Sequence, residues 1–274
     1  MIEDMSMKKI HIVRWLAGLL LLCILTGCAN PSPEPTDLPT DPAPTEPLVD
    51  DRTWAQRTVQ AYAELSGISY DAYPENMLIL LDKNPEAIGF VLRYPEDYGK
   101  TYEIDMSAYA DSETVPLFIQ WDQRWGYIPY GADVAAVTAC GPVCLSMVAY
   151  HLTGDENMSP DKMIQFAIDE GYCVPGNGSA WTLISRGAKK LGLNVQELPL
   201  SEGRIRRELE AGNPVICIMG PGVFTTTGHF IVLTGYEDGK FRVNDPNSVV
   251  RSSQLWSYSQ FQDQIRNLWA LSAP

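Results

Sequence analysis

Histidine and closely paired cysteine are scarce in this sequence, and their scarcity limits the metal chemistry open to it. The three histidines are His11, His151 and His229. The six cysteines include no Cys-x-x-Cys pair, and no His-x-x-x-His spacing occurs. Such spacings are the usual sequence signs of a zinc site. We therefore expect no metal.

Basic residues and phosphate-binding loops are also lacking. The chain has 20 Lys and Arg against 34 Asp and Glu, a net charge of −14. An acidic protein is repelled by phosphate backbones, so no nucleic-acid partner is expected. Gly220-Pro221-Gly222 lacks the Gly-Lys-Ser/Thr ending of a nucleotide-binding loop. The sequence thus predicts a protein without a cofactor.

One long apolar run is present, near the start of the chain. Lys8, Lys9 and Arg14 precede the run 15–25, which is short for a membrane-spanning helix and typical of a secretory signal. The following Leu25-Thr26-Gly27-Cys28 resembles the lipobox of bacterial lipoproteins, which implies a cleaved signal peptide over 1–27 and a lipid on Cys28. We expect an extracytoplasmic protein held at the bacterial membrane by that lipid. An uncleaved anchor is the alternative, and Met7 begins a better signal than Met1.

Past Cys28 the composition divides the chain. Residues 28–50 alternate proline with Thr, Asp, Glu and Ser, which predicts a disordered tether. Residues 51–112 read as a helical extension, with helices expected over 53–65, 76–81 and 86–92. Residues 113–274 form the expected main domain, whose first strand we place at 115–119.

The main domain has helices first and strands afterwards, which predicts an α+β fold. The apolar run 214–219 is expected to be a central strand. Strands 229–233 and 240–244 flank Asp238-Gly239, a strong hairpin turn. We expect a helix over 254–265 and a final strand over 268–271.

The most informative residue is Cys140, which opens Cys140-Gly141-Pro142-Val143-Cys144. Proline is tolerated in the first turn of a helix, so Cys140 is expected at a helix start, where the helix dipole favours a thiolate. Gly228-His229-Phe230 and Asn244-Asp245-Pro246-Asn247 follow far downstream. A cysteine, a histidine and an acid can supply a nucleophile, a base and an orienting group.

These motifs, with Gln120-Trp121-Asp122-Gln123-Arg124-Trp125, resemble the C39-like peptidases, which are papain-like cysteine peptidases. The resemblance runs from about Val115 to Trp269. It implies a helical part that carries the cysteine and an antiparallel sheet that carries histidine and acid. It also implies the roles: Cys140 as nucleophile, His229 as base, Asp245 as the group that orients His229, and Gln120 in the oxyanion hole. The family usually has glycine where this chain has Ala139.

Two of those roles are open from the residues alone. Gln120 lies twenty residues before Cys140, so the segment between them must loop out. If Glu237 faces Lys240 across the hairpin, His229 falls opposite Ser248, next to Asn247. Asp245 is then roughly 10 Å away along the strand, unless a bulge or a twisted pair closes the gap. Asn247 is therefore a rival orienting group.

The sequence predicts a surface-anchored cysteine peptidase that hydrolyses a peptide or amide bond through a thioester, with a peptide or protein as substrate. One alternative is a non-catalytic peptide-binding module on the same fold. Another is a transglutaminase-like acyl transferase that uses the same residues. The oligomeric state and a Cys173–Cys217 disulfide stay open at this level.

Overall fold

The computed structural model describes residues 50–110 and 112–274. The expected signal peptide, the lipid site at Cys28 and nearly all of the tether lie outside these residues. Residues 50–274 form one compact unit. Each helix among the described residues is too short or too polar to span a membrane.

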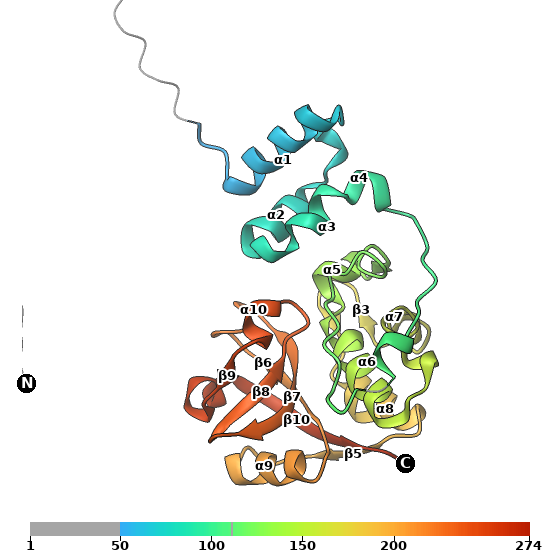
Figure 1. Ribbon diagram of the computed structural model, residues 1–274, viewed down its shortest axis with the longest axis vertical. Coiled ribbons are helices and arrows are strands. Elements are labelled where there is room, and N and C mark those ends of the chain that lie inside the picture. The colour runs from blue at the N-terminus through green and yellow to red at the C-terminus, as the bar shows by residue number, and fades with distance from the viewer. Residues whose placement is uncertain (1–49, 111) are drawn as a thin grey trace, which may run out of the picture. The chain divides into compact units, whose positions relative to one another are not determined.

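The first described segment is the helical block, residues 50–97, and its local signals are explicit (Figure 1). Thr53 and Gln56 form a capping box at the start of the first helix, and Gly67 ends that helix at φ 69°. Three of the later elements begin at or beside a proline, Pro74, Pro85 or Pro95, whose missing N–H costs nothing in a first helical turn. The elements are α1 (Trp54–Ser66), η1 (Tyr70–Ala72), α2 (Glu75–Lys83), η2 (Pro85–Ala87), α3 (Ile88–Leu92) and α4 (Tyr94–Asp97).

The strand expected at 115–119 is absent; this segment has no regular secondary structure. Pro116 has no N–H to donate to a ladder. The side chain of Asn244 instead donates to the carbonyl oxygens of Val115 and Pro116, at 3.0 and 3.1 Å. Val115 and Phe118 are still buried in the main core. The apolar pattern of the segment therefore reflects burial and not pairing in a sheet, and the predicted strand is wrong.

Short helices and turns follow and make up the helical part of the main domain. The longest helix begins at Cys140 and ends where Gly154 adopts φ 64°. The elements are η3 (Ser107–Tyr109), β1 (Pro129–Tyr130), β2 (Asp133–Val134), α5 (Ala135–Thr138), α6 (Cys140–Thr153), η4 (Glu156–Met158), α7 (Pro160–Asp169), β3 (Cys173–Val174), β4 (Gly178–Ser179), the π-helical turn η5 (Leu183–Gly187) and α8 (Ala188–Lys190).

The second part is a six-stranded antiparallel sheet in the order β5-β10-β6-β7-β8-β9 (Figure 1). The apolar strand β6 lies inside the sheet, as expected, and all five of its residues are buried. The elements are β5 (Asn194–Glu197), α9 (Glu202–Glu210), β6 (Val215–Met219), β7 (His229–Glu237), β8 (Lys240–Asn244), α10 (Val249–Ser252), β9 (Leu255–Trp256), η6 (Tyr258–Gln260), η7 (Gln262–Gln264) and β10 (Ile265–Ser272).

The helix expected over 254–265 is also wrong. That segment pairs briefly with β8 through Trp256, opposite Phe241, and then makes two short 3₁₀ turns. Phe261 and Trp256 are buried in one aromatic cluster with Phe224 and Phe241. Packing of these rings against the sheet overrides the local helical pattern.

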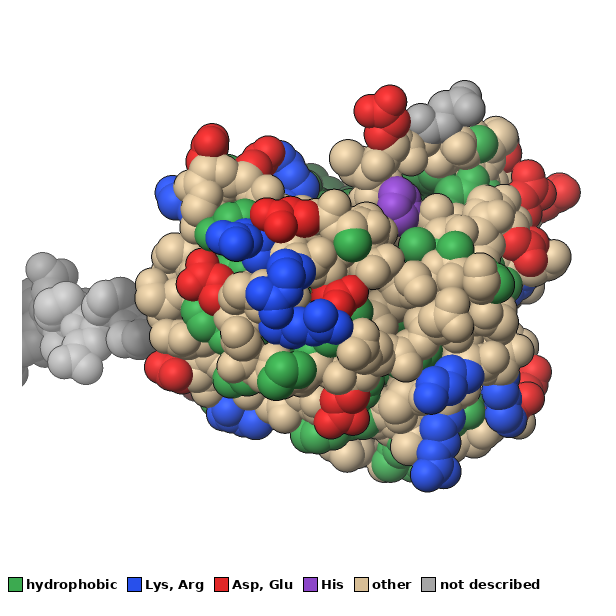
Figure 2. Space-filling view, turned by 90° about the horizontal axis from the view of Figure 1, so that it is seen from below, with side chains coloured by type: hydrophobic (Ala, Val, Ile, Leu, Met, Phe, Trp, Pro, Cys, Tyr) green, Lys and Arg blue, Asp and Glu red, His purple; other side chains and the backbone are tan. Residues whose placement is uncertain are grey.

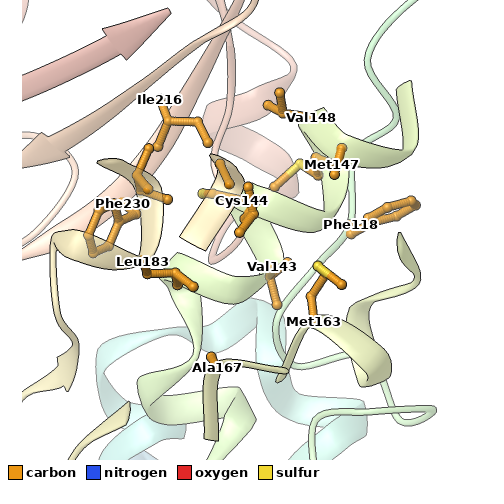
Figure 3. Close-up of a cluster of buried hydrophobic side chains, with 14 of the residues drawn as sticks. Phe118, Val143, Cys144, Met147, Val148, Met163, Ala167, Leu183, Ile216 and Phe230 are labelled. Carbon is orange, nitrogen blue, oxygen red and sulfur yellow. The ribbon is translucent and has the colours of Figure 1, made fainter. Parts of the chain in front are cut away.

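A separate hydrophobic core packs against each face of the sheet. On one face, α6 lies between the sheet and α7: Cys144 points toward Ile216 and Phe230, while Val143 is near Met163 (Figure 3). On the other face, residues of α9 and the two late 3₁₀ turns cover the alternate residues of β6 and β7. The strand order and the buried helix together confirm the predicted α+β fold.

Candidate active site

Cys140 is the first residue of α6, and its side chain is partly buried. Gly141 follows because a Cβ there would lie 2.9 Å from the side chain of Ser179. Pro142 fits the first turn, and residues 141–150 are all buried. The sequence therefore places the thiol at the start of a buried helix.

His229 is the first residue of β7, opposite Met219 of β6, and is buried. Its Nε2 lies 2.7 Å from Oδ1 of Asp245. The ring also interacts with the Cys140 thiol strongly enough to lower the pKa of that thiol. The structure thus brings Cys140, His229 and Asp245 together in one chain of contacts.

The hairpin between β7 and β8 explains why Asp245, and not Asn247, meets His229. Glu237 does pair with Lys240, but the register shifts between Leu233 and Gly235, so Thr234 is an extra residue. Val232 then faces Asn244, and continuing that register puts Asp245 opposite residue 231. Residues 229 and 231 point to the same face of the strand. The bulge thereby closes the gap that the simple register leaves.

Asp245 is fully buried, and its carboxylate oxygens all have donors. Oδ1 accepts from His229 and from the backbone N–H of Asn247, at 2.7 and 2.8 Å. Oδ2 accepts from Nε of Arg251 at 2.5 Å. The side chain of Asn247 is turned toward Asn84 instead, at 3.0 Å. Asn247 therefore supports Asp245 through its backbone.

The electrostatics of the three groups favour an ion pair. Burial alone would raise the pKa of the Cys140 thiol, but the hydrogen bond and charge of His229 outweigh it, helped by the N–H groups of Phe230 and Gly141, and the pKa is lowered. Burial alone would lower the pKa of His229, but Asp245 and then Cys140 raise it to about 10. The pKa of Asp245 is lowered because His229 and Arg251 outweigh burial. Between the first two pKa values, thiolate and imidazolium coexist.

Gln120 is buried between the segments that precede Cys140 and follow Asp245. Its backbone N–H donates to the carbonyl oxygen of Pro246 at 2.7 Å. Its Nε2 donates to the carbonyl oxygen of Ala136 in α5 at 2.6 Å. An amide nitrogen has two hydrogens, so one N–H remains after the bond to Ala136. The loop from 121 to 138 is accommodated by a hairpin and α5, which bring Gln120 close to the chain before Cys140.

Sequence reasoning missed Arg251, and the only signal available was a basic residue six positions after Asp245. The other three cysteines in the described part of the chain are free: Cys144 and Cys217 are buried, Cys173 is partly exposed, and no Cys173–Cys217 disulfide forms. In residues 50–110 and 112–274, no cluster of His, Cys, Asp and Glu could hold a metal ion. On the face in Figure 2, basic side chains are bordered by acidic ones.

A helical part that presents a cysteine at a helix start, beside an antiparallel sheet that presents histidine and acid, is the architecture of papain-like cysteine peptidases. The model of the Peptidase_C39 like family matches residues 112–272. The chain therefore belongs to the C39-like peptidase family, as the sequence motifs predict, and is a cysteine-peptidase-like protein.

Solved structures give a distant likeness. The peptidase domain of Streptococcus ComA, a bi-functional ABC transporter involved in a quorum-sensing pathway, is 20% identical with a TM-score of 0.41. The match covers 58% of this chain and 99% of that domain. A protein from Bacillus anthracis described as a C39-like peptidase is 15% identical, also with a TM-score of 0.41. That match covers 60% of this chain and 99% of the other. No curated protein matches the chain.

Proposed function

We propose that the protein is an active cysteine peptidase that hydrolyses a peptide or amide bond through a thioester on Cys140. One observation carries this proposal: Cys140, His229 and Asp245 lie in sequence, each beside the next. The pKa of the Cys140 thiol is lowered and that of the His229 imidazole is raised, which favours a thiolate–imidazolium ion pair. A non-catalytic binding module has no need of a charged thiolate. Membership of the family supports the same reaction class.

In the first half of the reaction, the Cys140 thiolate attacks the carbonyl carbon of the scissile bond and forms a C–S bond. The carbonyl oxygen becomes an oxyanion, which the free N–H of the Gln120 side chain and the backbone N–H of Cys140 would stabilise. The His229 imidazolium then gives its proton to the leaving amine as the C–N bond breaks. The products are a thioester and a neutral imidazole.

In the second half, neutral His229 takes a proton from a water molecule, which attacks the thioester carbonyl. The C–S bond breaks, the acid product leaves, and thiolate and imidazolium are restored. Asp245 holds Nε2 of His229 throughout, so that the other ring nitrogen faces Cys140. Arg251 and the Asn247 N–H keep the Asp245 carboxylate in place.

Selective alkylation tests the activated thiol directly. Near pH 6, we expect iodoacetamide to label Cys140 much faster than the other described cysteines, because only the pKa of Cys140 is lowered. Cys173 is a matched control, since it is also partly exposed while burial raises its pKa. Cys144 and Cys217 are buried and should stay unlabelled. Peptide mass spectrometry across pH measures the rates; equal rates at Cys140 and Cys173 would contradict an activated nucleophile.

We further propose that lipid on Cys28 anchors the protein to the bacterial membrane, on the sequence Leu25-Thr26-Gly27-Cys28. The mature protein should then partition into detergent with the membrane fraction. Cys28→Ala should release it or leave the precursor uncleaved. Intact-mass analysis of the membrane-bound form measures the lipid. Recovery of the unmodified protein solely in the medium would contradict the anchor.

A further inference from the structure

The loop after β8 carries both Asp245 and its cationic partner Arg251, and its shape decides where the carboxylate points. Asp245 begins the loop, and the backbone N–H of Asp245 donates to Ser252 at its far end, at 2.9 Å. Arg251 lies in α10, a helix of a single turn whose first residue is Val249. So short a helix has little stability of its own and depends on what satisfies its first N–H groups.

Glu86, from the helical block, satisfies those groups. Its Oε2 accepts from the backbone N–H of Val249 at 2.8 Å and from that of Val250 at 3.1 Å. Its Oε1 accepts the hydroxyl proton of Ser248, whose oxygen in turn accepts from the backbone N–H of Arg251 at 3.0 Å. One carboxylate therefore fixes the start of the helix that aims Arg251 at Asp245.

Asn84 holds the other end of the same loop. Its Nδ2 donates to the carbonyl oxygen of Asn247 at 2.7 Å and to the side-chain oxygen of Asn247 at 3.0 Å. Asn247 is the residue whose N–H binds Asp245. The side-chain oxygen of Asn84 also accepts from the backbone N–H of Glu86 at 3.1 Å, so the two residues belong to one capped turn at the start of η2.

The helical block is itself fixed to the chain that leads to Cys140. Phe90 stacks on Tyr127 at 4.1 Å, and the Tyr127 hydroxyl donates to the carbonyl oxygen of Phe90 at 2.7 Å. Val134 and Ala136 belong to the same buried cluster as the helices of the block. The block thus contacts both the segment before the thiol and the loop behind the acid, although the family match begins only at residue 112.

We propose that Asn84 and Glu86 are positioning residues of the active site, and that the helical block is needed for full peptidase activity. The inference rests on the proposed function, because Asn84 and Glu86 act through Asp245 and His229. Without Glu86, three donors at the start of α10 lose their shared acceptor, and Arg251 and Asp245 are free to shift. Displacements of about 1 Å far from the chemistry can cost on the order of 10²-fold in rate.

The pH profile of Cys140 alkylation tests this proposal without a known substrate. We expect Glu86→Ala, and further Asn84→Ala with Glu86→Ala, to move the Cys140 profile toward higher pH, in the direction given by Asp245→Asn but by less. Turnover of any peptide substrate should fall roughly tenfold or more, in kcat rather than KM. Glu75→Ala is the matched control, because Glu75 is an exposed acid in α2 of the same block. It should keep the wild-type profile.

Hydrogen exchange of residues 245–252 reports the loop directly and should be faster in Glu86→Ala than in Glu75→Ala. If Glu86→Ala does not fold, Glu86→Gln replaces it under the same criteria, since it keeps one acceptor oxygen and loses the charge. A wild-type profile in the Glu86 variant, beside a shifted profile in Asp245→Asn, overturns the positioning role and leaves the proposed function standing. An unshifted profile in Asp245→Asn also overturns the positioning role, because Asp245 then does not tune the thiol. Loss of the preferential labelling of wild-type Cys140 over Cys173 overturns the proposed function itself.

Discussion

Cys140→Ala is expected to abolish turnover while the protein stays folded. In the proposed mechanism the Cys140 thiolate forms the only covalent bond to the substrate, and loss of the nucleophile in a serine peptidase costs about 10⁶-fold in kcat. The side chain is partly exposed at a helix start, where alanine is compatible with the backbone. Digestion of a peptide library, with products identified by mass spectrometry, measures the loss and shows whether water or an added amine accepts the acyl group.

Cys144→Ala is the matched control for that experiment. Cys144 lies one turn further along α6, fully buried among Ile216 and Phe230, and burial raises the pKa of its thiol well above the usual value (Figure 3). We expect a stability loss of about 1 kcal/mol from the small cavity, with turnover retained. If the folded Cys140→Ala variant retains turnover, Cys140 is not the nucleophile.

Asp245→Asn has the second largest expected effect. The amide can donate to Nε2 of His229 and so favour the wrong tautomer; the equivalent change in a serine protease costs about 10⁴-fold. A cysteine enzyme should lose less, because its thiolate is already a good nucleophile. The charge of Asp245 is also the main favourable cause of the raised His229 pKa of about 10. Its removal lowers that pKa, so the alkaline limit of activity should move to lower pH.

Asn247→Ala provides the comparison. It removes only the side-chain bond to Asn84 and keeps the backbone N–H that binds Asp245. We therefore expect a much milder loss than for Asp245→Asn. Rate against pH for the two variants decides between them: a severe defect in Asn247→Ala beside near wild-type Asp245→Asn would mean that Asn247 orients His229. If neither matters, Cys140 and His229 work as a pair.

The sequence predicts well where local chemistry decides the structure. The helix start at Cys140 and the turn at Asp238-Gly239 both follow from adjacent residues, and each is present. The apolar run of β6 likewise identifies an inner strand. The family motifs also led to Gln120, although only the structure shows which backbone groups hold it.

Prediction failed where distant residues decide. Segment 115–119 is apolar enough for a strand, but it does not pair in a sheet. Pro116 has no N–H to donate, and the Asn244 side chain donates to the carbonyl oxygens of Val115 and Pro116. Segment 254–265 has a helical pattern that buried aromatic packing of Trp256 and Phe261 overrides. Arg251 and Glu86 carry no local sign of their roles, because each acts only after the chain has folded around Asp245.

The extra residue Thr234 affects how an active site should be recognised in the sequences of related proteins. The number of residues between the histidine and the acid matters as much as their identity. One residue more or fewer in that hairpin would turn the acid to the opposite face of the sheet. A motif search that scores the histidine and the acid separately loses this information. Spacing across the hairpin is therefore a sharper criterion for an intact site than the presence of both residues.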